Sequence, residues 1–512
     1  MKEVIIKIIY IRFENEFNFE YDIQALIRGF YPGEELKSIM PGEALVAEAC
    51  DETVKFVMSF CYLVCEDAAN RDKLILKVYD RELNLTKEVC VFTDYSDRVE
   101  TKNILKRLIY DVLYEITGKT LPWGTLSGIR PTKITSKMLA DGMSKEDVKR
   151  RIKDTYYISD KKADLSIKVS ENELNILRDI DYKRGYSVYI GIPFCPTTCL
   201  YCSFTSYPIS AYKIMVKDYL DAVIKEIDFV SKEFADMHMN TIYIGGGTPT
   251  TLEPDMLDYL MTAIREKLDF SHNLEFTVEA GRPDSITREK LEVLKKHNVT
   301  RISVNPQTMK QKTLDIIGRR HTVEQVREAF LMAREAGFDN INMDFIVGLP
   351  EETIDDIRMT MEETKLLKPD SITIHSLAVK RAARLNIFKE EYDRYAYNNS
   401  EEIITLTYNS AAEMGMEPYY LYRQKNMTGN MENVGYSVPG KAGIYNILIM
   451  EEKHPIIALG AGASTKIVYP GEEKIERVEN VKDVKEYISR VDEMIERKRK
   501  AVCEWKKSLK TS

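Results

Sequence analysis

Three cysteines in one short stretch are the residues best suited to carry chemistry. Cys195, Cys199 and Cys202 have C-x3-C-x2-C spacing and directly follow a strand-like run. Thiolates are soft donors that suit an iron–sulfur cluster or zinc. A structural zinc site requires four protein ligands, and no other Cys or His lies within twenty residues of this loop. We therefore favour a four-iron cluster whose open iron chelates a small molecule through amine and carboxylate groups. Buried free thiols and a zinc site completed from elsewhere are the alternatives.

The remaining cysteines carry weaker patterns. Cys61 and Cys65 form a C-x3-C pair within an apolar, strand-like run, where both thiols can share one face. We interpret them as buried structural thiols and assign them no function. Cys50, Cys90 and Cys503 show no pattern. Eight cysteines in 512 residues are too few for a disulfide scaffold, so we expect a reducing, cytoplasmic setting.

Charge and hydropathy exclude two classes of partner. The chain has 73 Lys and Arg against 81 Asp and Glu, a formal net charge of −8. This balance argues against bulk attraction to nucleic acid or to anionic lipid. Lys7 and Arg12 interrupt the apolar N-terminal run, so we expect no secretion signal. No apolar stretch approaches the roughly 20 residues that a transmembrane helix requires, so we expect no membrane span.

The elements that must position the cysteines begin near residue 186, where short β-rich runs alternate with helical stretches. This alternation predicts a parallel sheet built from βα units and, with six units, a partial (β/α)6 barrel. A doubly wound sheet is the alternative. The predicted strands are Ser187–Ile190, Thr241–Ile244, Leu274–Val278, Arg301–Val304, Ile341–Ile346 and Ser371–His375. The predicted helices are 212–233, 254–268, 287–297, 322–336, 352–367 and 398–414.

Polar and glycine residues gather just after these strands. In parallel β/α folds the carboxyl ends of the strands form one mouth, where ligands bind. The six loops are therefore predicted to converge on one site. Besides the cysteine loop, the residues concerned are Gly245–Thr248, Glu279, Gln307, Asp344 and Ser376.

The rest of the chain divides by composition. We expect an N-terminal α/β domain over 1–120, a connector with helices over 121–184, and the partial barrel over 185–385. A C-terminal α+β extension on the substrate side follows over 386–470, and a charged helical tail, read as a solvated face, covers 471–512. Outside the barrel, the predicted strands are Val4–Arg12, Lys55–Tyr62, Lys73–Val78, Lys87–Phe92, Tyr419–Arg423, Tyr445–Met450 and Ile456–Leu459, and a helix is predicted over 102–117.

With these landmarks the sequence resembles the radical S-adenosylmethionine (SAM) superfamily. Within it, the resemblance is to the oxygen-independent coproporphyrinogen III oxidase-like family, and to its HemZ-type coproporphyrinogen dehydrogenases. The motifs that carry it are YIGIPFCPTTCLYCSFTSYPI (189–209), YIGGGTPT (243–250), VEAGRPD (278–284), RISVNPQTM (301–309), GRRH (318–321), NMDFIVGLPEET (342–353) and HSLAVKRAARLN (375–386).

The resemblance implies two cofactors and residues for each. Cys195, Cys199 and Cys202 would hold a 4Fe-4S cluster. Glu279 would pair with the cationic part of SAM, Arg319 with its carboxylate, and Gln307 and Asp344 with its ribose. Gly246 and Gly247 would let the backbone approach the methionine part of SAM, because they carry no side chain. The full set of implied SAM contacts is Tyr189, Tyr201, Gly246, Gly247, Thr248, Glu279, Gln307, Arg319, Asp344 and Ala378.

The implied activity is porphyrin and haem biosynthesis. A one-electron donor such as flavodoxin or ferredoxin reduces the cluster, SAM is cleaved to a 5′-deoxyadenosyl radical, and the radical takes hydrogen from a propionate of coproporphyrinogen III. Carbon dioxide leaves and a vinyl group forms. Cations for the propionates are expected at Lys380, Arg381, Arg384 and Arg423.

Relatives with the same cysteine loop suggest an alternative function. A haem chaperone, or a radical SAM methyltransferase acting on haem, would likewise bind a tetrapyrrole. His321 and His375 are then the candidate axial ligands. Gly191 stands where the best-known oxidases have His.

Overall fold

The computed structural model describes residues 7–15, 18–43, 53–63, 72–128, 130–378, 383–387, 397, 399–424, 431–469 and 474–509. The chain divides into two compact units, Met1–Ile167 and Lys168–Ser512, and each is described by itself. Within these ranges no helix combines the length and apolar character needed to cross a membrane. Cys50, Cys65, Lys380 and Arg381 lie outside the described residues, as does the start of the strand predicted from Val4.

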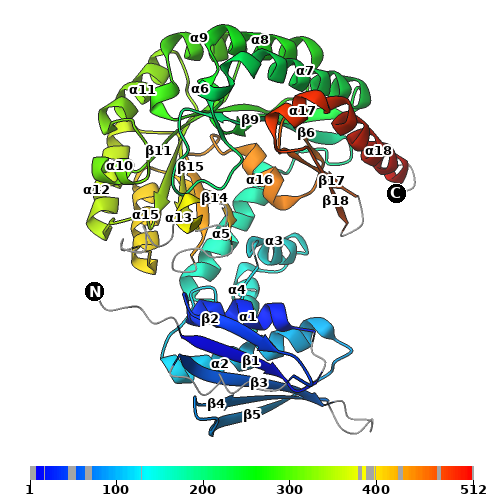
Figure 1. Cartoon of the computed structure of the whole chain (residues 1–512), viewed down its shortest axis with the longest axis vertical. Helices are drawn as coiled ribbons and strands as arrows, with labels where there is room; N and C mark the ends of the chain where they lie inside the picture. The colour runs from blue at the N-terminus through cyan, green and yellow to red at the C-terminus, as the bar shows by residue number, and fades with distance from the viewer. Residues whose placement is uncertain are drawn as a thin grey trace. The chain divides into compact units, whose positions relative to one another are not determined.

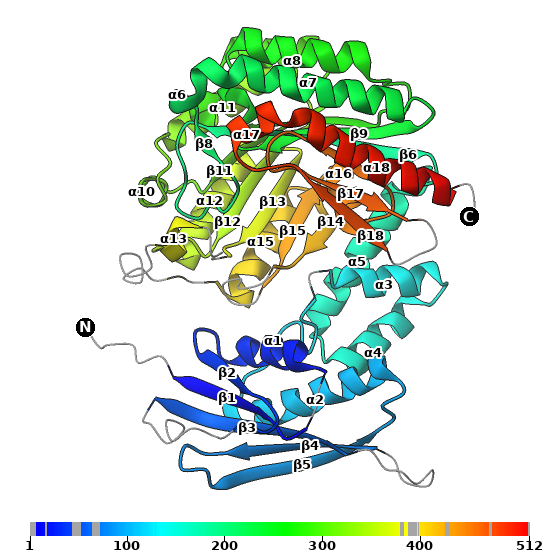
Figure 2. The ribbon, with the colours of Figure 1, turned by 45° about the vertical axis from the view of Figure 1, so that its right-hand side comes forward.

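The N-terminal unit is built on a five-stranded sheet with the order β2-β1-β3-β4-β5. Helices α1 (Glu20–Phe30) and α2 (Arg98–Thr117) pack on one face of this sheet (Figures 1 and 2). The four predicted strands and the predicted helix are present. Helix α1 was not predicted, although its buried residues recur at helical spacing. The strands are β1 (Ile8–Phe13), β2 (Glu35–Ile39), β3 (Val54–Leu63), β4 (Asp72–Tyr79) and β5 (Leu85–Thr93), and helices α3 (Thr132–Ala140), α4 (Lys145–Tyr156) and α5 (Asp160–Ile176) follow.

The second unit contains the partial barrel. Its six parallel strands lie in sequential order, without the reversal of a doubly wound sheet, so the predicted partial barrel is confirmed. They are β6 (Gly185–Ile192), β9 (His238–Gly246), β10 (Glu275–Gly281), β11 (Arg301–Gln307), β12 (Ile341–Val347) and β13 (Ser371–Ser376). The helices that cover the outer face of the sheet (Figure 1) are α7 (Val216–Glu233), α8 (Pro254–Lys267), α9 (Arg288–Lys296), α11 (Val323–Glu335) and α12 (Ile354–Leu367).

Local sequence sets the start of several of these helices. Thr322 caps α11 and Thr353 caps α12, each in a capping box in which the third helical residue bonds back to the cap. These caps satisfy backbone N–H groups that the first helical turn leaves without partners. Each of these helices therefore begins at a defined residue, and this sets where the preceding loop at the carboxyl ends of the strands stops.

The C-terminal extension lengthens the barrel sheet at both edges to eleven strands. At one edge, β15 (Asn433–Ser437) lies antiparallel to β13, and β14 (Glu417–Tyr422) lies outside it. At the other edge, β16 (Ile456–Leu459) lies parallel to β6. Strands β17 (Ser464–Val468) and β18 (Ile475–Glu479) follow (Figure 2). Helix α15 (Glu401–Glu413) precedes β14.

One segment of the extension differs from the prediction. Tyr445–Met450 was predicted as a strand, and it lies within helix α16 (Ile444–Glu451). The carboxylate of Glu275 accepts hydrogen bonds from the backbone N–H groups of Ile444, at 2.6 Å, and of Tyr445, at 3.3 Å. These bonds cap the helix from the start of β10, so the signal that sets its conformation lies far away in the sequence.

The tail also differs from the prediction of a solvated helical region. Residues 475–479 form strand β18, and helices α17 (Val484–Ser489) and α18 (Val491–Leu509) follow. Lys498 of α18 is fully buried and forms an ion pair with the equally buried Glu226 of α7. Glu226 also accepts hydrogen bonds from Tyr487 and from the backbone of Gly460. The charged tail is therefore partly an internal element of the second unit.

Candidate functional site

A cavity of about 620 Å³ lies inside the partial barrel. Its volume falls within the range of about 300–1,000 Å³ that is typical of small-molecule sites. All thirteen residues expected to bind the cluster or SAM line this one cavity, although they come from seven separate stretches of sequence. They are Tyr189, Cys195, Cys199, Tyr201, Cys202, Gly246, Gly247, Thr248, Glu279, Gln307, Arg319, Asp344 and Ala378.

The cavity runs along the inside of the barrel rather than only across its mouth. Strand β11 shows this directly, because Arg301, Ser303, Asn305 and Gln307 all line it. Alternate side chains of a strand point to the same face, and six residue steps span about 20 Å. The cavity thus reaches from the cysteine loop down to the amino-terminal end of β11.

The cysteine loop is anchored by the short strand β8 (Tyr207–Pro208) and by the glycine-rich loop that follows β9. Cys195 ends the short strand β7 (Phe194–Cys195), which pairs with β8. Backbone bonds of 2.7 Å join Gly247 to Ile192 and Thr248 to Phe194. The Thr248 hydroxyl lies 3.6 Å from the Cys195 sulfur. The glycine-rich loop after β9 therefore supports the first cysteine.

The thiols are placed where a metal cluster would stabilise them. The pKa of Cys195 is raised to about 11, chiefly by burial, while Thr248 and Arg282 lower it and Cys202 and Cys199 raise it. Cys195 therefore becomes a thiolate at neutral pH only beside a compensating positive group, which bound iron supplies. The donor set fits a cluster.

The arrangement does not support the single-zinc alternative. Among the described residues, no three His, Cys, Asp or Glu side chains are arranged to hold one metal ion. Zinc would require its ligands to converge on a common point. A 4Fe-4S cube instead offers each thiolate its own iron. Three thiols around one cavity, without a fourth described ligand, match the cluster.

The glycines at the end of β9 leave room that side chains would fill. Gly246 has a φ of +105°, in the region that favours glycine. A Cβ atom on Gly247 would lie 2.5 Å from the Phe194 carbonyl oxygen and 3.0 Å from the Cys195 sulfur. A substituted residue would therefore press on the cysteine loop, which explains the need for glycine there.

Two carboxylates in the cavity wall, Glu279 and Asp344, lie close enough for their charges to interact. Burial raises the pKa of Glu279 to about 7, and the charge of Asp344 acts in the same direction, whereas a 2.5 Å hydrogen bond from Tyr243 lowers it. Asp344 accepts a 2.6 Å bond from Asn342. A cationic ligand between these groups would relieve their repulsion, as the sulfonium and ammonium groups of SAM would.

Two buried polar groups beside the cysteines retain unused hydrogen-bonding atoms. Arg319 donates 2.9 Å to the hydroxyl of Tyr201 and also contacts the Asn305 carbonyl, but its Nε has no partner in the described part of the chain. Oε1 of Gln307, whose φ is +72°, also lacks a partner there. Such buried atoms are costly unless a ligand satisfies them, and SAM supplies both donors and acceptors.

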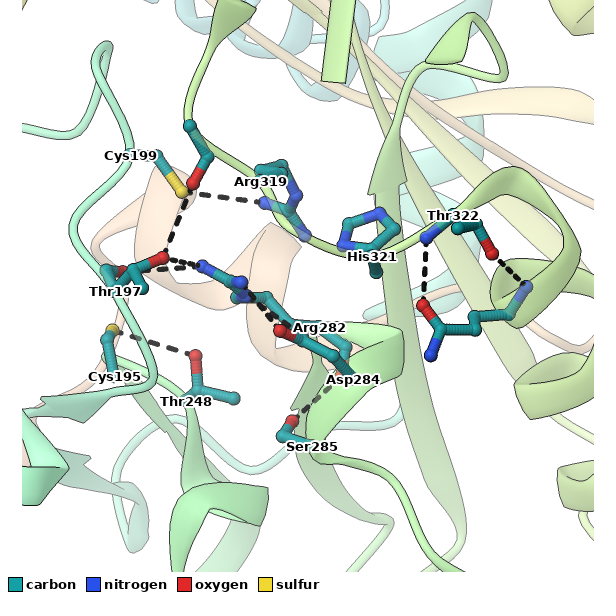
Figure 3. Close-up of polar contacts among 12 residues, drawn as sticks. Cys195, Thr197, Cys199, Thr248, Arg282, Asp284, Ser285, Arg319, His321 and Thr322 are labelled. Atoms are coloured by element: carbon teal, nitrogen blue, oxygen red, sulfur yellow. Dashed lines mark hydrogen bonds and ion pairs between the residues drawn. The ribbon is translucent and has the colours of Figure 1, made fainter. Parts of the chain in front are cut away.

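A polar cluster that follows β10 lies beside the cysteine loop (Figure 3). Arg282 makes two bonds to Asp284, of 2.9 and 2.6 Å, and a third of 2.6 Å to the hydroxyl of Thr197. His321 is fully buried beside this pair, and burial together with the charges of Arg319 and Arg282 lowers its pKa to about 3. His321 does not line the cavity, so it is not placed as an axial ligand there.

The sequence did not reveal the aromatic wall of the cavity. Tyr243 and Tyr445 stack with ring centroids 4.5 Å apart, and Tyr420 and Tyr422 stack at 6.1 Å. All four line the cavity, as do the cations Arg301 and Lys466. Polar residues at alternate positions of a buried strand, as in β11, were a signal that could have indicated an internal surface. Tyr445 could not be found in this way because its helix was not predicted.

Two cations expected to bind the substrate, Arg384 and Arg423, do not line the cavity, whereas His375 does. Arg423 is buried near Glu432 and does not line the cavity, and burial lowers its pKa to about 10. Arg384 begins the short helix α13 (Arg384–Ile387) and is exposed. His375 does line the cavity, where the Tyr422 hydroxyl lies 3.2 Å from its Nδ1.

Comparisons with known proteins agree with this geometry. Residues 189–364 match the Radical SAM superfamily. The chain is 42% identical over 406 residues to the oxygen-independent coproporphyrinogen-III oxidase-like protein HemZ of Bacillus subtilis, covering 78% of this chain and 80% of that protein. It is 38% identical over 195 residues to the haem chaperone HemW of the same organism, covering 38% of this chain and 51% of that protein. The fold is similar to that of the coproporphyrinogen III oxidase HemN of Escherichia coli, with a TM-score of 0.50 and 23% identity over 61% of this chain and 70% of that one.

Proposed function

The chain belongs to the HemN/HemZ-like family of radical SAM proteins, and from this premise we propose that it is an oxygen-independent coproporphyrinogen III dehydrogenase. The cofactors of the family are a 4Fe-4S cluster and SAM. In the proposed reaction, two propionates of coproporphyrinogen III become vinyl groups. Each conversion removes one hydrogen atom and one electron from the propionate and releases carbon dioxide, and the electron passes to an external acceptor.

The observation that carries this proposal is the composition of the cavity inside the barrel. Near the cysteine loop it is lined by thiols, glycines and carboxylates, whereas farther along the barrel it is lined by stacked tyrosines and by Arg301. Aromatic faces suit the pyrrole rings of a porphyrinogen, and a guanidinium suits a carboxylate. The lining thus supports cofactors and a tetrapyrrole substrate in one cavity.

The residues of the chain have separate tasks in this proposal. Cys195, Cys199 and Cys202 would hold the cluster, and Glu279 and Asp344 would hold the cationic and ribose parts of SAM. When bound, the two cofactors supply one-electron reduction and hydrogen-atom abstraction. The barrel walls limit the contact of reactive species with water, and the glycines allow close approach of the ligand to the backbone.

The test is an anaerobic assay of the reconstituted protein. SAM, a chemical reductant and coproporphyrinogen III are added, and both 5′-deoxyadenosine and vinylated porphyrins are measured. We expect both products. Formation of 5′-deoxyadenosine without a vinylated product would support radical SAM chemistry but contradict coproporphyrinogen III as the substrate.

The haem chaperone is the alternative that the same preparation tests. Its supporting observations are the similarity to HemW and the position of His375 in the cavity wall. It predicts one haem per chain, loss of that haem in His375→Ala, and no porphyrinogen turnover. The dehydrogenase predicts turnover that does not depend on added haem.

A further inference from the structure

Arg282 combines burial with three directed contacts beside the cysteine loop. Its side chain is about 4% exposed, and its fork faces the carboxylate of Asp284, with the shortest N–O distance at 2.6 Å. The remaining terminal nitrogen donates 2.6 Å to the Thr197 hydroxyl and 3.4 Å to the Thr197 carbonyl oxygen. Figure 3 shows this guanidinium between the loop and the end of β10.

Thr197 is the midpoint of the loop, two residues from Cys195 and two from Cys199. Its hydroxyl receives the bond from Arg282 and donates 3.3 Å to the carbonyl of Gly318. A second backbone bond, 3.1 Å from Leu200 to Ile317, holds the same loop farther along. Thr197 is therefore the point where three segments meet: the cysteine loop, the end of β10 and the turn before Arg319.

A largely buried ion pair such as Arg282–Asp284 contributes little net stability by itself. Removing two charges from water costs several kcal/mol, and apolar residues of similar size often serve as well. Arg282 also lines the cavity and lies close enough to Cys195 to act on its charge. Three thiolates on a cluster concentrate negative charge at this place, and a fixed guanidinium offsets part of it.

We propose that Arg282 is a positioning residue for the cluster: oriented by Asp284, it fixes the middle of the loop through Thr197 and keeps one positive charge beside the cluster. The proposal depends on the cluster alone and not on the identity of the substrate. If this role of Arg282 were wrong, the outcome of the dehydrogenase assay would not change. The failure of this proposal can therefore be distinguished from the failure of the proposed function.

Four variants separate the contact from the charge. Thr197→Val removes the contact and keeps the charge. Arg282→Lys keeps the charge without the fork, and Arg282→Gln removes both. Asp284→Asn removes the counter-charge. The matched control is Arg288→Gln, six residues after Arg282 in the sequence. It removes an exposed arginine that forms an ion pair with Glu335.

The first readout uses protein without cofactors, so it does not depend on activity. The alkylation rate of each cysteine is measured by mass spectrometry, with the exposed Cys90 and Cys503 as internal references. Loss of a hydrogen bond to a charged group corresponds to about tenfold in rate. We expect Cys195 and Cys199 to react about tenfold faster in Thr197→Val, which keeps the cation, and at the wild-type rate in Arg288→Gln.

The second readout is the midpoint potential of the reconstituted cluster. Reduction adds negative charge, so loss of a nearby cation disfavours it. We expect a more negative potential in Arg282→Gln, a more positive one in Asp284→Asn, and values close to wild type in Arg282→Lys and Thr197→Val. Unchanged alkylation in Thr197→Val would overturn the proposal. Equal potentials in Arg282→Gln and Arg282→Lys would overturn it as well. If Arg282→Gln does not fold, Thr197→Val and Asp284→Asn still test both parts.

Discussion

The hydroxyl of Tyr243 lies 2.5 Å from Oε1 of Glu279, and this short hydrogen bond joins the aromatic wall of the cavity to its acidic side. The bond stabilises the ionised form of Glu279, while burial and Asp344 disfavour that form. The pKa of about 7 is the balance of these effects. The charge of Glu279 therefore changes within the ordinary working range of pH.

The affinity for SAM should follow this titration. Below pH 7 Glu279 becomes protonated and no longer attracts a cation, so we expect the affinity to fall up to about tenfold per pH unit. Tyr243→Phe removes the stabilising bond, raises the pKa of Glu279 further and moves the midpoint to higher pH. Calorimetry between pH 5.5 and 8.5 measures both. Tyr445→Phe, which alters the neighbouring stacked ring, is the control, and an affinity independent of pH would contradict the role of Glu279.

Iron content should depend on three cysteines only. We expect Cys195→Ala, Cys199→Ala and Cys202→Ala each to lose the cluster after anaerobic reconstitution, because each thiolate binds a different iron. Cys90→Ala should keep it, since Cys90 lies on the exposed side of β5 in the other unit. Iron analysis and visible absorbance give the answer. Full iron content in any of the three single variants would argue against this ligand set.

Gly247→Ala should disturb both the fold and the binding of SAM. The added Cβ would lie 2.5 and 2.8 Å from two backbone carbonyl oxygens, which cannot move as a side chain can. Overpacking of this kind costs about 1–3 kcal/mol. Denaturant unfolding measures the loss, and calorimetry measures SAM binding. Gly128→Ala, where no atom lies within 4 Å of the new carbon, should leave both unchanged.

The buried pair of Lys498 and Glu226 gives a test of the tail. Lys498→Met leaves the Glu226 carboxylate without its cation, and we expect a loss of about 3–5 kcal/mol in the free energy of unfolding. The double variant Lys498→Met, Glu226→Gln should recover part of this loss, because no isolated charge remains. Urea titrations compare the two. If the double variant were less stable than the single one, the pair would not act as described.

Much of the site could be predicted because its signals are local. The cysteine spacing needs no tertiary information, and Glu279, Gln307 and Asp344 follow from the rule that ligands bind at the carboxyl ends of parallel strands. The six strands themselves were visible because buried parallel strands are short apolar runs between helical stretches.

What could not be predicted depends on partners distant in sequence. Arg282 acquires its place through Thr197, and helix α16 begins where it does because Glu275 caps it. A run rich in Tyr and Ile has the composition of a strand, and only the tertiary cap decides otherwise. The burial of Lys498 likewise depends on Glu226, on a helix at the opposite end of the unit's sequence.

The pairing of β6 with β16 has a consequence for the order of events at the ribosome. Ser187, at the start of the barrel, takes Ile456 as its neighbour, and the Gly191 carbonyl is bonded by Tyr219, whose hydroxyl also receives the N–H of Ala461. The strand that leads into the cysteine loop therefore lacks one of its neighbouring strands until residues 456–459 have been synthesised. We expect nascent chains arrested before residue 456 to leave these thiols open to alkylation, and chains in which β16 has paired with β6 to protect them.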